Sequence, residues 1–133
     1  MNNNISILSA GTAIYEVLNE ALKGKVTKVF PVAADEAVLP YVCYHRDKLD
    51  TITYKDGGNG SYMPPNVAEI SVDCFSSTYK GSVLLAEEVR KALDGISIRT
   101  DDGLIIRACW MCDAVEMWAN DAYVQSLVFK LKA

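Results

Sequence analysis

Apolar residues spaced three and four positions apart predict an amphipathic helix near the start of the chain. The helix is expected from Ala10 to Lys23, because Ser9 can cap its first turn and Gly24 can end it. A stripe of this kind covers one side of a helix and packs against a core. The stripe consists of Ile14, Val17, Leu18, Ala21 and Leu22.

The same spacing returns later and predicts a second helix from Tyr79 to Asp94. Ser77 or Thr78 can cap its first turn, and Gly95 directly follows its expected end. Charged residues occupy the opposite side of this helix, which is therefore expected to face water. Its apolar stripe consists of Leu85, Val89, Ala92 and Leu93.

Residues that alternate between apolar and polar predict strands in the rest of the chain. The clearest alternation puts Ala68, Ile70, Val72 and Cys74 on one face of a single strand. Pro31 has no amide hydrogen to donate, so the strand that contains it should end there or lie at a sheet edge. The expected strands span residues 26–32, 41–46, 67–75, 96–99, 104–118 and 123–132, with a possible short one at 51–55.

The order of these elements is helix, strands, helix, strands, which is typical of an α+β protein. We expect an antiparallel sheet of about five or six strands with the two helices packed on one face. A chain of 133 residues is expected to form a single domain, residues 1–133. Within it, residues 1–8 are expected to be a flexible N-terminus and residues 47–65 a long loop rich in glycine and proline.

Composition narrows the classes of function. Half of the residues are apolar and 23% are charged, as in an ordinary globular protein. The net charge of −4 argues against a protein that grips nucleic acid, which needs clustered Lys and Arg. The N-terminus lacks the positive start of a secretory signal, and no apolar run is long enough to cross a membrane. A cytosolic product with four reduced cysteines is expected.

The cysteines raise the question of a metal or redox site. Cys109 and Cys112 form a CxxC pair, but the pair lies inside an expected strand, where residues three apart point to opposite faces. We therefore expect no metal and no cofactor, and we expect all four cysteines to be core residues. Trp110, between the two thiols, is likewise expected in the core.

Cys43 and His45 form a minimal pair of thiol and base, because alternate residues of a strand share a face. No orienting carboxylate or oxyanion device is recognisable near them in the sequence. We expect no catalytic residue in this chain, and a small thiol enzyme that uses Cys43 and His45 stays open as an alternative.

The long loop and the last hairpin supply the candidate contact residues. The glycine-rich tip of the loop has little reason to be ordered alone, and we expect it to be a contact arm that orders on assembly. Trp118, beside an expected turn, could anchor an interface. The candidate contacts are Tyr54, Lys55, Asp56, Asn59, Tyr62 and Trp118.

Two stretches carry a resemblance to a known family. They are Val29–Arg46, VFPVAADEAVLPYVCYHR, and Glu69–Gly95, EISVDCFSSTYKGSVLLAEEVRKALDG. Their order and spacing resemble the phage tail-completion, or tail-terminator, family of siphophage head–tail joining proteins. The similarity covers nearly the whole chain after Ser9. The segment from Lys48 to Pro65 departs from it, because it is longer and richer in glycine.

The resemblance implies a virion structural protein without enzymatic activity. It implies a ring, commonly a hexamer, at the head-proximal end of the tail, assembled in the host cytoplasm. The implied partners are further copies of the chain, the tail tube protein and the head–tail connector protein, while DNA passes through the bore without specific binding. Another ring-forming phage component, such as a connector stopper or a tail tube subunit, is the alternative within this class.

Overall fold

The computed structural model describes residues 6–51 and 65–133. Helix α1 spans Ala10–Ala21 and follows a single turn of 3-10 helix, η1, at Ile7–Ser9. It ends slightly before the expected Lys23, and Gly24 then takes a positive φ of 80°. Ile7 of η1 is buried and belongs to the main core.

Helix α2 spans Tyr79–Leu93, almost as expected. The hydroxyl of Thr78 accepts a hydrogen bond from the amide of Gly81 at 3.0 Å, which satisfies a free donor of the first turn. Gly95, with a φ of 81°, adopts the left-handed backbone that glycine tolerates best and lets the chain turn away from the helix.

Five strands form one sheet in the order β1-β2-β3-β7-β6, and β4 and β5 form a separate hairpin. All neighbours in the large sheet are antiparallel except β1, which runs parallel to β2. The sheet is therefore mixed, although the α+β class is confirmed. The strands are β1 Val29–Pro31, β2 Tyr41–Asp50, β3 Val67–Ser76, β4 Ile98–Arg99, β5 Ile105–Ile106, β6 Ala108–Ala119 and β7 Ala122–Lys132.

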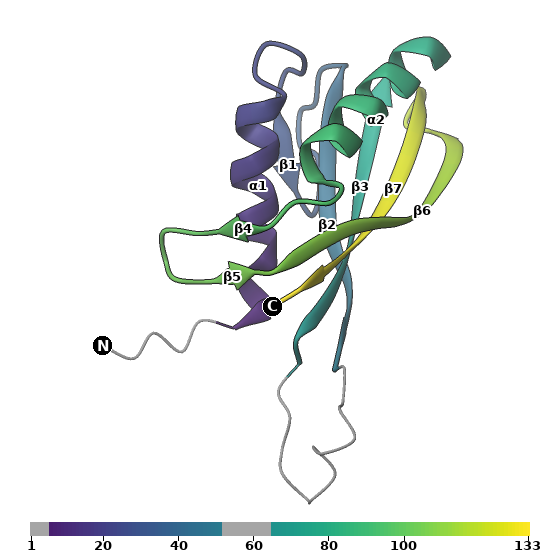
Figure 1. Ribbon diagram of the computed structural model, residues 1–133. Coiled ribbons are helices and arrows are strands. Elements are labelled where there is room, and N and C mark those ends of the chain that lie inside the picture. Colours follow the sequence, from purple (N-terminus) through teal and green to yellow (C-terminus); the bar gives the residue numbers. More distant parts are fainter. Residues whose placement is uncertain (1–5, 52–64) are drawn as a thin grey trace, which may run out of the picture.

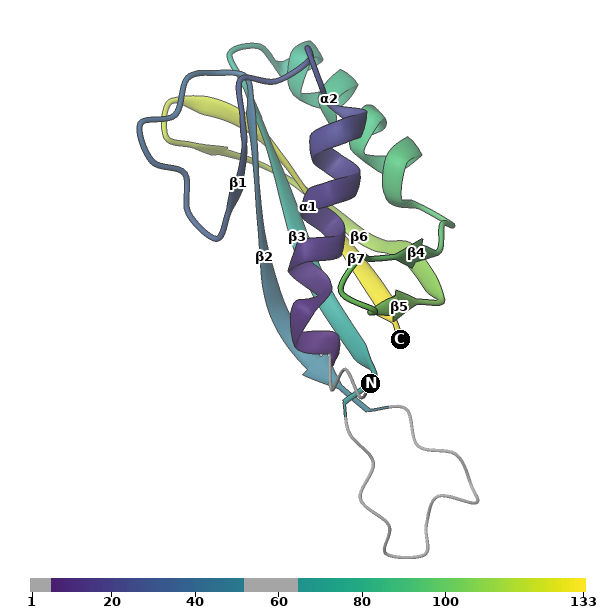
Figure 2. The same ribbon diagram turned by 90° about the vertical axis from the view of Figure 1, so that its left-hand side faces the viewer.

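Both helices lie on the same face of the sheet, as Figures 1 and 2 show from two sides. Their apolar stripes pack on the buried face of β3 and β7, and together these residues form the main core. The alternation predicted for β3 is confirmed, because its four expected core residues are all fully buried. The largest fully buried side chains include Phe129, Ile14, Leu18, Leu22, Ile70 and Leu93.

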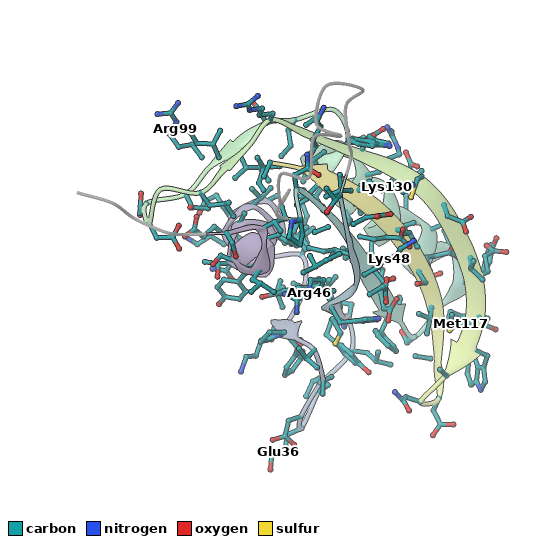
Figure 3. The ribbon with its side chains drawn as sticks, turned by 90° about the horizontal axis from the view of Figure 1, so that it is seen from below. Glu36, Arg46, Lys48, Arg99, Met117 and Lys130 are labelled. Carbon is teal, nitrogen blue, oxygen red and sulfur yellow. The ribbon has the colours of Figure 1, made fainter. Side chains whose placement is uncertain are left out.

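The other face of the sheet has no helix over it, and part of it carries polar residues (Figure 3). Another part of this face carries a smaller buried cluster that consists of Phe30, Tyr41, Cys43, Phe75, Ala122 and Val124. Lys48, Glu69, Lys130 and Trp110 face one another across β2, β3, β7 and β6. Opposite charges in neighbouring positions of a sheet stabilise it modestly. β2 continues to Asp50, so the first part of the expected loop, residues 47–50, is strand.

The expected strand over residues 104–118 is in fact two strands, β5 and β6, separated at Arg107. After this break the buried positions shift by one residue from those predicted. Cys109, only 1% exposed, is therefore buried in place of its neighbour Trp110. Trp110, expected in the core, is 36% exposed, and Cys112 is also exposed. Those two core predictions are therefore wrong, whereas the burial of Cys43, Cys74 and Cys109 is confirmed.

Loss of the cap of α2 gives a first measurable prediction. Thr78→Ala should lower the free energy of unfolding by about 1 kcal/mol, because the amide of Gly81 loses its partner. Urea unfolding of the purified protein measures this change. The control is Thr12→Ala, the same replacement at an exposed site inside α1, which should be neutral or slightly stabilising. Equal losses in the two variants would contradict a specific role of the cap.

Candidate interaction surface

Strand β6 is a long edge strand whose apolar side chains face water. Within the described residues it pairs only with β7. At its start the outer backbone edge is occupied, because the amide of Gly95 donates to the carbonyl of Cys109 at 2.7 Å and the amide of Met111 donates to the carboxylate of Asp94 at 2.9 Å. From Asp113 to Ala119 no described strand pairs with this edge, which is therefore accessible to a further strand or to another chain. Four large apolar side chains on it are exposed by 36–61%, namely Trp110, Val115, Met117 and Trp118. An exposed edge of this length and composition is typical of a protein–protein interface.

The charge on β6 has a single sign. The strand carries Asp113 and Glu116 and no Lys, Arg or His. Glu116 accepts hydrogen bonds from the hydroxyl of Tyr79 at 2.5 Å and from the side-chain amide of Gln125 at 2.9 Å. These hydrogen bonds hold the pKa of Glu116 below its usual value, so the carboxylate stays ionised at neutral pH.

Three exposed aromatic rings gather at the turn between β6 and β7. The ring of Trp118 meets that of Tyr123 edge-on, with centroids 5.0 Å apart, and Tyr123 meets Tyr79 edge-on at 6.1 Å. Edge-to-face contacts keep such rings in place without burying them. Trp118 is 61% exposed, so it is accessible to a partner, and its role as an interface anchor stays a prediction.

The other candidate contact residues, Tyr54, Lys55, Asp56, Asn59 and Tyr62, lie outside the described residues. Sequence reasoning missed the rest of β6, above all Val115 and Met117. Its alternation indicated a strand, but nothing in it showed that the strand lies at an edge.

The thiol and base on β2 share the uncovered face, as their spacing predicts. Cys43 is only 7% exposed, and burial, followed by the nearby charge of Asp73, raises the pKa of its thiol. The imidazole Nε2 of His45 lies 2.8 Å from a carboxylate oxygen of Asp47, which also accepts a hydrogen bond from the hydroxyl of Ser71.

Asp47 is the orienting carboxylate that sequence reasoning did not find near Cys43 and His45. The sequence does contain a feature that indicates this pair: Asp47 stands two residues after His45, and residues two apart in a strand share a face. A catalytic cysteine needs a lowered pKa or an adjacent base that takes its proton. In this protein the surroundings of Cys43 favour the protonated thiol, and Nε2 of His45 is directed at Asp47.

The described part of the chain contains no group of three or more His, Cys, Asp or Glu residues placed to hold a metal ion. Cys109 is buried and Cys112 is exposed, so the two thiols of the CxxC pair diverge as predicted. In residues 6–51 and 65–133, neither helix has the length and apolar character that crossing a membrane would require.

Comparison with known proteins gives a likeness in structure and none in sequence. Neither a protein-family model nor a curated protein matches the chain. A solved structure described as the virion of a native gene transfer agent (GTA) particle contains a chain with the same fold, at a TM-score of 0.60 and 15% sequence identity. The match covers 92% of each chain. The protein therefore shares its fold with a chain of that virion over nearly its whole length.

Proposed function

We propose that this protein is a structural subunit of a phage-like particle, and that its copies form a ring that caps the tail tube and joins it to the head connector. The observation that carries the proposal is β6, a long edge strand with exposed apolar side chains that pairs only with β7 among the described residues, in a fold shared with a virion chain. The resemblance of Val29–Arg46 and Glu69–Gly95 to tail-terminator proteins supports the same assignment.

A ring accounts for the exposed edge. When subunits meet head to tail around a closed ring, each sheet edge is covered by the neighbouring subunit, and no edge remains exposed. A ring whose two faces differ can bind the tube on one face and the connector on the other, and this stops the tube from growing. We infer a hexamer at the head-proximal end of the tail, assembled in the host cytoplasm.

The charge fits a ring through which DNA passes. Each subunit carries a net charge of −4, and an acidic bore repels phosphates instead of retaining them. Tight binding of DNA to the purified protein at low salt would count against this role. The proposed function needs no catalytic residue, and the raised pKa of the Cys43 thiol argues against this cysteine as a nucleophile.

Deletion of the gene from a genome that encodes the particle tests the proposal. Without the cap, tubes should grow past their normal length, and electron micrographs should show a broad distribution of overlong tails. Expression of the wild-type chain in trans should restore a uniform length. Full heads that lack tails and leak DNA would instead indicate a connector stopper, and an absence of tubes would indicate a tube subunit.

A further inference from the structure

A groove lies at the opposite edge of the sheet from β6. It consists of two adjoining hollows of about 650 and 300 Å³ between α1, β1 and β2, and both are lined by Thr12, Pro31 and Tyr44. The groove also contains apolar side chains that are exposed to water: Leu8 at 59%, Val32 at 74% and Tyr15 at 37%. A groove with this lining can take up apolar side chains of another protein.

The charge of the α1–β1 groove is opposite to that of β6. Arg46 lines the larger hollow and Lys28 the smaller one, and neither hollow is lined by an Asp or a Glu. The guanidinium of Arg46 donates to the carbonyl of Leu8 at 3.1 Å, which holds this cation in place. Figure 3 shows Arg46 beside α1 and β1, well apart from Met117 on β6.

We propose that β6 of one copy docks into the α1–β1 groove of the next copy. Val115 and Met117, which β6 presents on the uncovered face of the sheet, would enter the groove, while Asp113 on the same face would meet Lys28 and Arg46. Two different surfaces on opposite edges of one sheet make a head-to-tail contact, which can repeat and close into a ring. The inference rests on the proposed ring and specifies its interface.

The alternative is a symmetric dimer in which β6 pairs with β6 of a second copy. Such a pair would join two strands that each carry Asp113 and Glu116 and no cation, and it would leave the groove empty. β1 is short and ends at Pro31, so it offers little backbone to a continuous ladder. We therefore place the contact mainly in side chains that fill the groove.

Charge reversal distinguishes the two arrangements. Asp113→Lys and Lys28→Glu should each weaken self-association, measured by sedimentation across protein concentrations, about tenfold or more. A mixture of the two variants should regain self-association when the variants alternate. Each contact then joins either two wild-type positions or two charge-reversed positions, so the charges at every contact are opposite. Asp101→Lys and Lys91→Glu, exposed sites on neither surface, serve as controls and should change little. An unchanged Lys28→Glu variant would overturn the proposal.

Cross-linking locates the contact directly. Cys112 on β6 is the exposed one of the four cysteines, and Val32→Cys adds a thiol at the groove. A short bis-maleimide should link Cys112 to the introduced thiol of another copy and leave the wild-type chain unlinked. Links between two Cys112 thiols would overturn the proposal in favour of the symmetric dimer.

A chain that remains monomeric at several hundred micromolar would also overturn this interface. It would leave the proposed function standing, because tail length in the gene deletion tests that function separately. The opposite outcome is also distinguishable. Cross-links between Cys112 and the groove, together with tails of normal length in the gene deletion, would support the interface and refute the proposed tail-capping function.

Discussion

Phe129→Ala should lower the free energy of unfolding by about 3–5 kcal/mol, a large part of the total stability of a domain of this size. Phe129 lies on β7 and is the largest fully buried side chain in the described part of the chain. Its strand neighbours are Ile70 on β3 and Met111 on β6, and the helices cover the same face. Alanine at this position leaves a cavity that these elements can fill only by moving.

Urea unfolding with linear extrapolation measures this loss. Val128→Ala is the matched control, because Val128 precedes Phe129 on β7 but faces the uncovered side of the sheet, opposite Ser71. It is only partly buried, and its loss should cost about 1 kcal/mol. Losses of similar size in the two variants would contradict a single main core on the helical face.

Local patterns were enough to predict the helices and the best strand. The cap at Thr78 and the glycine at Gly95 bound α2 through contacts within a few residues of the helix. The alternation of β3 holds because the strand lies in the middle of the sheet with the helices over one face. Each of these features depends on neighbours in the sequence, so the sequence displays them.

Features that depend on distant pairing were not predictable in this way. The parallel pairing of β1 with β2 is decided by where the chain returns after Pro31. The break at Arg107 is accompanied by a hydrogen bond from its amide to the carbonyl of Lys132 at the other end of the chain. The alternation of residues 104–118 continues across Arg107 without a turn residue, so the sequence alone places Trp110 and Cys112 on the core face.

The candidate interface was predictable only in part, for the same reason. Trp118 was recognised because it is a large aromatic residue next to a turn, and this is a local signal. The exposure of Val115 and Met117 follows from the position of β6 at the edge, beyond β7 in the strand order. Alternation assigns a residue to one of two faces, but it does not tell whether anything covers that face or the strand beyond it.

One thiol per chain should react quickly with iodoacetamide at neutral pH, and that thiol should be Cys112. It is the exposed cysteine, whereas Cys43, Cys74 and Cys109 are buried. Burial raises the pKa of all three buried thiols, that of Cys109 to about 12, so at neutral pH very little of each is thiolate. The buried thiols also need a local opening before the reagent can reach them. We expect their rates to be at least about 100-fold lower.

Mass spectrometry of digested protein gives the rate at each cysteine, and Cys112→Ser should remove the fast reaction. Below the pKa of Cys112 the rate should rise about tenfold per pH unit, because only the thiolate attacks. Rapid and selective labelling of Cys43 at neutral pH would mean that His45 or another group activates it against the effect of burial and Asp73. That result would favour the thiol enzyme over the structural subunit. Slow labelling of Cys43 leaves the exposed edge of β6 as the feature that a function must explain.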